Sequence, residues 1–270
     1  MNNTEKRNPK TMHIDTMTTM QMLEIINEED AGVIKAVRAE LPQIALAIDA
    51  IADCLNKGGR LFYIGAGTSG RLGVMDAAEC PPTYGVSRDL VHAIIAGGQK
   101  TMTQASENEE DSRENGISDL MACDLKSDDA VVGISASGGA PYVLGALEKA
   151  KEMGCVTVGI SNNKGCLLDK TADISICVDT GAEVITGSTR MKAGTSQKLV
   201  LNMLSTCAMI KTGKVYENLM INLKPTNIKL RKRVISIVMD LTDYDEAKAV
   251  CALEKNDWDI RKTVDEYKGR

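Results

Sequence analysis

Short, continuously apolar runs alternate with helical patterns through the middle of the chain. Runs of this kind are typical of parallel strands covered by helices on both faces, whereas half-exposed strands alternate apolar and polar residues. The pattern therefore predicts an α/β fold built on a doubly wound parallel sheet of about five strands. The predicted strands are 61–64, 90–96, 130–134, 156–160 and 174–178.

Helical patterns come before this strand region. Thr18 and Gln21 have the spacing of a capping box, which predicts a short helix over 18–30. Apolar residues at spacings of three and four predict a longer helix over 33–55, with a kink at Pro42. The chain therefore begins with two N-terminal helices ahead of the sheet.

The domain organisation follows from where these patterns change. After Pro225 the pattern becomes short and charged, and it predicts two small helices over 245–253 and 257–267. We expect an N-terminal helical segment over 1–58, a sheet domain over 59–228 and a small C-terminal helical module over 229–270.

Composition narrows the classes of function. The net charge of −5 gives no basic excess for nucleic acid, and no apolar run approaches the roughly 18 residues that span a membrane. The eight cysteines are scattered without a C-x-x-C pair, which is typical of reduced, cytoplasmic proteins. His13 and His92 are the only histidines, so we expect no metal site. We also expect no cofactor.

A loop rich in glycine and hydroxyl groups follows the first predicted strand. It reads Gly65-Ala66-Gly67-Thr68-Ser69-Gly70 and precedes a helix that we expect to begin near Arg71. Hydroxyls and the amides at a helix N-terminus can hold a phosphate group. Dinucleotide-binding domains share the glycine spacing, but no acidic residue ends the next strand, where a ribose partner is expected. We therefore predict a phosphate site at Gly67, Thr68, Ser69 and Gly70.

A second loop of the same character follows the third predicted strand. It reads Ser135-Ala136-Ser137-Gly138 and lies at the equivalent strand end. Neither loop carries the lysine of a nucleotide-hydrolysing P-loop. The two loops together favour a phosphate monoester bound between them, with Ser135, Ser137 and Gly138 in contact with it.

Longer stretches of the chain carry a family resemblance over roughly residues 4–230. The matching stretches are 4–9, 64–73, 76–84, 94–98, 110–114, 181–195 and 199–204. They resemble N-acetylmuramic acid 6-phosphate etherases, which have the sugar-isomerase (SIS) fold. The resemblance implies a homodimeric lyase that binds a small sugar phosphate. It would cleave the D-lactyl ether of N-acetylmuramic acid 6-phosphate to give N-acetylglucosamine 6-phosphate and D-lactate.

The resemblance also implies catalytic residues. Glu79 would protonate the departing lactate oxygen, and Glu110 would remove the proton from carbon 2 of the sugar. From the residues alone, Glu79 is a glutamate that follows a helix, ahead of the stiff Pro81-Pro82 pair. Glu110 lies in an acidic run of the kind that is usually solvated. Only the family match singles out these two carboxylates.

Further contacts are expected from the matching stretch 181–195. Ser188, Thr189 and Lys192 are candidate substrate-binding residues. Lys192 is either a cation for the phosphate or a solvated helix lysine, and the sequence leaves both readings open.

The chain departs from the family pattern after the second loop. It has Gly139-Ala140 where members usually have Arg-Thr, which removes a cation and a hydroxyl from the expected phosphate site. Its C-terminal module is also shorter than usual. Two alternatives stay open: an SIS-type sugar-phosphate isomerase, and a sugar-phosphate-sensing regulatory protein. The Glu79 motif argues against the isomerase, and the single SIS domain argues against the longer, two-domain regulators.

Overall fold

The computed structural model describes residues 2–104, 108–223, 225 and 227–269. The chain divides into two compact units, Met1–Ala78 with Asp89–Ala208, and Glu79–Arg88 with Met209–Arg270. The segment boundaries expected from the sequence stay a prediction. Among the described residues, no helix combines the length and the apolar character needed to cross a membrane.

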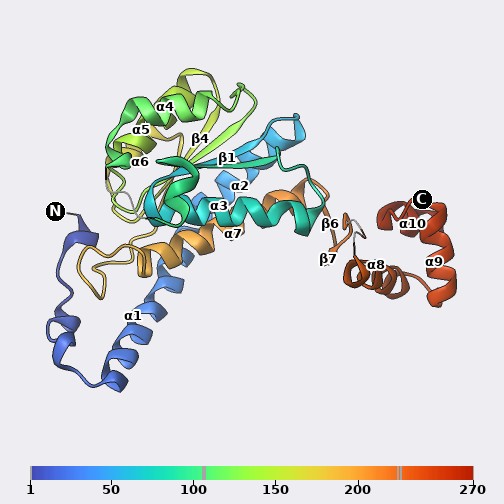
Figure 1. Cartoon of the computed structure of the whole chain (residues 1–270), viewed down its shortest axis with the longest axis horizontal. Coiled ribbons are helices and arrows are strands. Elements are labelled where there is room, and N and C mark those ends of the chain that lie inside the picture. Colours follow the sequence, from blue (N-terminus) through green and yellow to red (C-terminus); the bar gives the residue numbers. More distant parts are fainter. Residues whose placement is uncertain (1, 105–107, 224, 226, 270) are drawn as a thin grey trace. The chain divides into compact units, whose positions relative to one another are not determined.

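A five-stranded parallel sheet forms the centre of the first unit (Figure 1). The strand order is β2-β1-β3-β4-β5, and each neighbouring pair is parallel. Both β1 and β3 are buried along their whole length, as the continuous apolar runs require. The predicted sheet is therefore confirmed. The strands are β1 Leu61–Gly65, β2 Val91–Ile95, β3 Ala130–Ile134, β4 Val156–Ser161 and β5 Ile174–Cys177.

Helices cover both faces of this sheet (Figure 1). On one face lie α4 (Arg113–Met121), α5 (Pro141–Glu152) and α6 (Leu167–Thr171), which bury a core with side chains of β1 and β3. The other face carries α2 (Leu41–Asn56), α3 (Gly67–Tyr84) and α7 (Lys192–Lys211). Between β2 and α4 are two 3-10 turns, Gly98–Met102 and Glu109–Asp111.

The N-terminal segment differs in part from its prediction. Three 3-10 turns, Asn3–Glu5, Pro9–Thr11 and Ile14–Thr16, precede α1 (Thr19–Ala39). The predicted capping box is confirmed, because Thr18 and Gln21 exchange both side-chain hydrogen bonds. The predicted helix end near Asp30 was wrong. Helix α1 instead ends at Ala39, and Glu40 separates it from α2. The chain breaks there because Pro42 lacks an amide proton and is tolerated only in the first turn of a new helix.

Helix α3 also differs from its prediction. It begins at Gly67, inside the first loop, so Thr68 and Ser69 belong to its first turn. It continues past Glu79 to Tyr84, although the sequence placed Glu79 after the helix. Pro81 and Pro82 are accommodated because Ala77, Cys80 and Tyr84, at helical spacing, bury one face of the helix.

The second unit has a core of its own. A short antiparallel pair, β6 (Val215–Tyr216) and β7 (Leu219–Met220), precedes α8 (Ile228–Leu241), α9 (Glu246–Lys255) and α10 (Ile260–Tyr267). The sequence predicted only the last two helices. The final helix starts later than predicted because Asp257 and Trp258 have left-handed φ angles of 52° and 61°. Apolar residues of all three helices form the core: Val234, Ile237, Val238, Ala249, Leu253, Ile260 and Val264.

Candidate active site

The carboxyl ends of β1 and β3 lie side by side, with Gly65 paired to Ile134. β2 lies on the far side of β1, and β4 lies on the far side of β3, so the strand order reverses between β1 and β3. Parallel α/β sheets bind ligands at such a reversal, outside the carboxyl ends of the strands. The two hydroxyl-rich loops both begin at this point.

The first loop folds back tightly against the end of β1. A Cβ atom at Gly70 would lie 2.7 Å from the Gly65 carbonyl oxygen and 2.6 Å from the Ile95 side chain, so only glycine fits there. Gly67 has a φ of 53°, which glycine adopts without strain. Because α3 starts at Gly67, the first-turn amides, which have no partner within the helix, belong to this loop. Such amides favour an anion.

The second loop presents two serine hydroxyls. Ser135 Oγ accepts the Gly138 N–H at 3.1 Å, and Ser137 Oγ accepts the Gly139 N–H at 3.2 Å. The two hydroxyl oxygens lie 3.3 Å apart. Because each oxygen already accepts a backbone N–H, the hydroxyl protons remain for donation to each other or to an anion. Gly138 has a φ of 67°, and a Cβ there would lie 2.1 Å from Cys166 Sγ, so this glycine shapes the loop.

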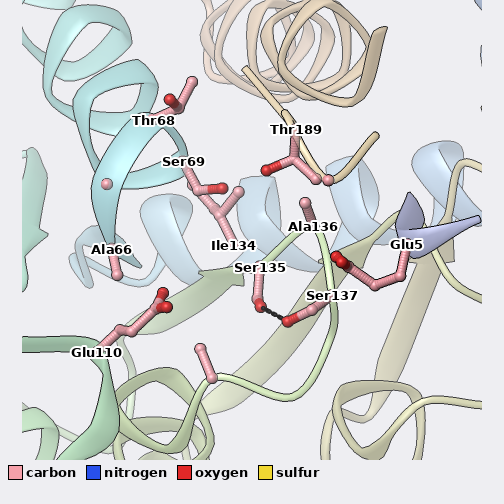
Figure 2. Close-up of a pocket in the computed structure, with 13 residues that line it drawn as sticks. Glu5, Ala66, Thr68, Ser69, Glu110, Ile134, Ser135, Ala136, Ser137 and Thr189 are labelled. Carbon is pink, nitrogen blue, oxygen red and sulfur yellow. Dashed lines mark hydrogen bonds between the residues drawn. The ribbon is translucent and has the colours of Figure 1, made fainter. Parts of the chain in front are cut away.

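A cavity of about 250 Å³ lies between the loops. Figure 2 shows Glu110 and Glu5 on opposite sides of the hydroxyl groups that line it. These glutamates are the charged residues among the described lining, which contains no lysine or arginine. A bound phosphate would therefore rely on hydroxyls and amides. The predicted site residues that line the cavity are Gly67, Thr68, Ser69, Glu110, Ser135, Ser137 and Thr189.

Glu110 comes from the 3-10 turn Glu109–Asp111. The residue as a whole is exposed, but protein atoms around its carboxyl group exclude part of the solvent. This desolvation raises the pKa of Glu110, and the neighbouring Asp111 carboxylate raises it further. A carboxylate with a raised pKa is a stronger base than an ordinary glutamate.

Glu5 reaches the cavity because the N-terminal segment is anchored beside it. Thr4 is fully buried, and its hydroxyl accepts a hydrogen bond from Asn163 Nδ2 at 3.0 Å. The Gly187 amide donates to the Thr4 carbonyl at 3.3 Å. Sequence reasoning did not select Glu5. The one available signal was its position in the stretch 4–9, which matches the family.

Lys192 does not line the cavity. Its Nζ donates to Glu29 Oε2 on α1 at 2.6 Å. Its backbone amide and that of Ala193 donate to the fully buried Glu183 carboxylate at 3.0 and 2.9 Å. Glu183 thereby satisfies two amides at the start of α7. A contact between Lys192 and the phosphate would require Lys192 to leave Glu29.

Four other predicted residues are also absent from the described lining. Gly70 and Gly138 allow the close packing of the two loops, where a Cβ atom would clash with neighbouring atoms. Ser188 lies in the sequence between Gly187 and Thr189, which both line the cavity. Glu79 has an exposed side chain on α3, ten residues after Ser69, and belongs to the second compact unit. The functional roles of these residues remain predictions.

Two family models match parts of the chain. The glucokinase regulatory protein N-terminal SIS domain matches residues 43–151, and the SIS domain matches residues 100–207. Together they span the sheet and both hydroxyl-rich loops.

Longer matches come from bacterial proteins named N-acetylmuramic acid 6-phosphate etherase. The protein from Clostridium beijerinckii is 51% identical over 261 residues, which are 97% of this chain and 86% of the relative. The protein from Aeromonas hydrophila is 54% identical over 254 residues, which are 94% of this chain and 85% of the relative. The chain belongs to the N-acetylmuramic acid 6-phosphate etherase family. This confirms the resemblance inferred from the sequence.

Solved structures share the fold of this etherase family member at low sequence identity. A phosphoheptose isomerase from Francisella tularensis has a TM-score of 0.53 at 19% identity and covers 71% of this chain and 98% of its own. A phosphoheptose isomerase from Neisseria gonorrhoeae has a TM-score of 0.54 at 17% identity and covers 70% and 98%. With the SIS model, these likenesses confirm the predicted SIS fold.

Proposed function

We propose that this chain is a lyase that cleaves the D-lactyl ether of N-acetylmuramic acid 6-phosphate, giving N-acetylglucosamine 6-phosphate and D-lactate. Membership of the etherase family supports the substrate and the reaction. One observation in the structure supports the location of the site. The carboxyl group of Glu110 and the hydroxyls of both loops line one cavity, at the point where the strand order reverses.

The phosphate end of the substrate lies between the two loops. Ser135 and Ser137 donate hydroxyl protons to it, and the first turn of α3 supplies backbone amides. Gly139 has no side chain with which to replace the arginine usual in the family. The phosphate is therefore held without a lysine or arginine from the described lining.

The chemistry is an elimination followed by a hydration. In the ring-opened sugar, carbon 2 lies next to an aldehyde, which makes its proton removable. Glu110 takes this proton, and its raised pKa suits a base. The bond from carbon 3 to the lactate oxygen then breaks, and Glu79 protonates the departing oxygen. Water adds across the resulting double bond, so that one water is consumed for each lactate released.

The two alternatives differ in what the site must do. A sugar-phosphate isomerase needs a base at carbon 2 but no acid for a leaving group, and a sensing protein needs neither. Relatives more than 50% identical over nearly the whole chain are named as etherases, which favours the lyase. Incubation with N-acetylmuramic acid 6-phosphate and detection of free D-lactate distinguishes the lyase from both alternatives.

Hydrogen exchange at carbon 2 in heavy water tests the division of labour between the glutamates. Exchange needs only the base, whereas lactate release needs both groups. Glu79→Gln should lower lactate release by about a hundredfold or more and keep measurable exchange. Glu110→Gln should abolish both. Full lactate release by either variant would refute the two-carboxylate mechanism.

We further propose a cytoplasmic homodimer in which each site is completed by Glu79 from the partner subunit. SIS proteins commonly pair in this way, and Glu79 is absent from the described lining. Helix α1 exposes Met20, Leu23 and Ile34 at 64%, 57% and 61%, which suits a subunit contact. The eight cysteines are all unpaired thiols, which suits a reducing compartment.

A further inference from the structure

The N-terminal turn Asn3–Glu5 is held in place by contacts with distant parts of the chain. Thr4, at its centre, is fully buried, and its carbonyl accepts the Gly187 N–H at 3.3 Å. Asn3 Nδ2 donates to Asp179 Oδ2 at 3.0 Å. These two bonds connect the turn to the segment between β5 and α7, which supplies part of the cavity lining.

Asn163 connects the same turn to the second loop. This residue is 4% exposed, and its Nδ2 donates to the Ala136 carbonyl at 2.9 Å and to Thr4 Oγ1 at 3.0 Å. Because a carbonyl oxygen can only accept, the Ala136 contact determines which side of the amide carries the nitrogen. The Asn163 oxygen then faces the Thr4 amide, which donates to it at 3.4 Å. One buried side chain therefore joins the turn to the loop.

Both segments that Asn163 joins contribute to the cavity. Ala136 and Glu5 line it, whereas Asn163 is not among the described lining residues. A Cβ atom at Gly187 would lie 3.3 Å from Glu5 Oε2, so the Glu5 carboxylate lies against the Gly187 backbone. Figure 2 shows this carboxylate turned towards the second loop. The place of the exposed Glu5 side chain therefore depends on how the buried Thr4 is anchored.

Glu5 gives the cavity a capacity that the two loops lack. A phosphate between the loops finds donors in the hydroxyls of Ser135 and Ser137 and in the first-turn amides of α3. An ionised carboxylate has only acceptor oxygens, so Glu5 repels the phosphate and attracts hydroxyl donors. Sugar hydroxyls are such donors.

We propose that the turn Asn3–Glu5 is a sugar-binding wall of the cavity, and that Asn163 is the positioning residue that holds it against the second loop. Glu5 accepts hydrogen bonds from sugar hydroxyls, and Asn163 acts through Thr4 and Ala136 without touching the substrate. This inference deepens the proposed function, because it rests on a sugar phosphate occupying this cavity. It makes the N-terminal segment, which precedes the sheet, a part of the site.

Thr4→Val tests the turn and leaves the second loop in place. Valine has nearly the shape of threonine but lacks the hydroxyl that accepts from Asn163, whereas the bond from Asn163 to Ala136 remains. Calorimetric titration at constant ionic strength gives the dissociation constants of N-acetylglucosamine 6-phosphate and of sulfate, which has no sugar hydroxyls. The variant should bind the sugar phosphate about threefold to tenfold more weakly and sulfate about twofold to fivefold more tightly. A general loss of structure would weaken both ligands.

Matched variants control for stability and identify the route of the effect. Thr4→Ser keeps the hydroxyl and should bind both ligands within about twofold of the unmodified chain. Thr157→Val makes the same substitution near the start of β4, where a fully buried hydroxyl donates to Asp173 Oδ2 at 2.7 Å, and it should also leave both constants within about twofold. In the Glu5→Gln background, Thr4→Val should change neither constant by more than about twofold, because the carboxylate that the turn places is already gone.

The results that would overturn the proposal are distinguishable. If Thr4→Val weakens both ligands, or if its effect adds in full to that of Glu5→Gln, the turn does not act by placing Glu5. If Thr4→Val changes neither constant while Ser137→Ala weakens both ligands, the cavity binds the substrate and the turn is not part of the site. If neither variant changes either constant, or if the unmodified chain binds neither ligand, the proposed site fails as well.

Discussion

Lys192 Nζ donates a hydrogen bond of 2.6 Å to Glu29 Oε2, and the two side chains are only 5% and 10% exposed. Lys10 and Asn8 donate to the same carboxylate, at 2.8 and 2.9 Å. Glu29 therefore joins α1, the start of α7 and the N-terminal segment. Burial alone would raise the pKa of Glu29, but the hydrogen bonds from Lys10 and Lys192 outweigh it and lower the pKa to about 2.

The depressed pKa of Glu29 predicts a pH-dependent contribution to stability. The ordinary glutamate pKa is 4.5, so the charged form stabilises the folded state above that pH, by about 3 kcal/mol. This contribution is lost as the pH falls from about 4.5 towards 2. Glu29→Gln should lower the free energy of unfolding at pH 7, and its difference from the unmodified chain should shrink at pH 3. Urea denaturation at both pH values measures this.

Glu28→Gln is the control for that experiment, because Glu28 is the exposed neighbour of Glu29 on α1. It should change the free energy of unfolding by less than about 0.5 kcal/mol at either pH. Equal effects of the Glu28 and Glu29 variants would contradict a specific role for the buried pair.

The raised pKa of Glu110 predicts the acidic side of the activity profile. A general base acts only when deprotonated, so kcat/KM should fall as the pH drops through the Glu110 pKa, above the ordinary value of 4.5. Asp111→Asn removes one of the two causes of the shift and should move this limb to lower pH. Glu114→Gln, a nearby exposed glutamate that does not contribute to the shift, should leave the limb in place. A limb that does not respond to Asp111→Asn would mean that another group titrates.

Glu5 should act on the sugar and the phosphate in opposite directions. Its carboxylate lines the same cavity as Ser135 and Ser137, so it repels a dianion there and accepts hydrogen bonds from sugar hydroxyls. Glu5→Gln should strengthen inhibition by sulfate about twofold to fivefold and raise KM for the substrate. Glu24→Gln, an exposed charge on α1, controls for net charge. A fall in kcat of about a hundredfold would instead identify Glu5 as a general acid.

Mixed dimers test whether Glu79 and Glu110 of one site come from different subunits. Glu79→Gln and Glu110→Gln chains, each nearly inactive alone, are coexpressed. If the site is shared, each mixed dimer has one intact site, and random pairing restores about a quarter of full activity. If both glutamates come from one chain, no site in any dimer is intact, and coexpression restores nothing. Size-exclusion chromatography of each variant confirms that pairing itself is unchanged.

Features that depend on neighbours in sequence could be predicted without the structure. The five strands follow from their apolar runs, because only a sheet covered on both faces buries such runs completely. The capping box at Thr18 and Gln21 involves residues three apart. The two loops were placed at one edge because parallel strands share their direction. The predicted ends of helices were less reliable. Helix α3 continues past Pro81 and Pro82, where Ala77, Cys80 and Tyr84 pack one of its faces into the interior.

Contacts between distant segments were decided only by the tertiary structure. Glu5 reaches the cavity because Thr4 is anchored to Asn163, 159 residues away. From the sequence, Lys192 could equally contact the phosphate or lie in solvent. Its buried ion pair with Glu29 depends on the packing of α1 against the start of α7, which the sequence did not predict. Ser69 Oγ donates to Gln197 Oε1 at 2.8 Å, although the two residues are 128 positions apart in the sequence. Local sequence specifies which groups are present, whereas burial and partners decide what each group is able to donate or accept.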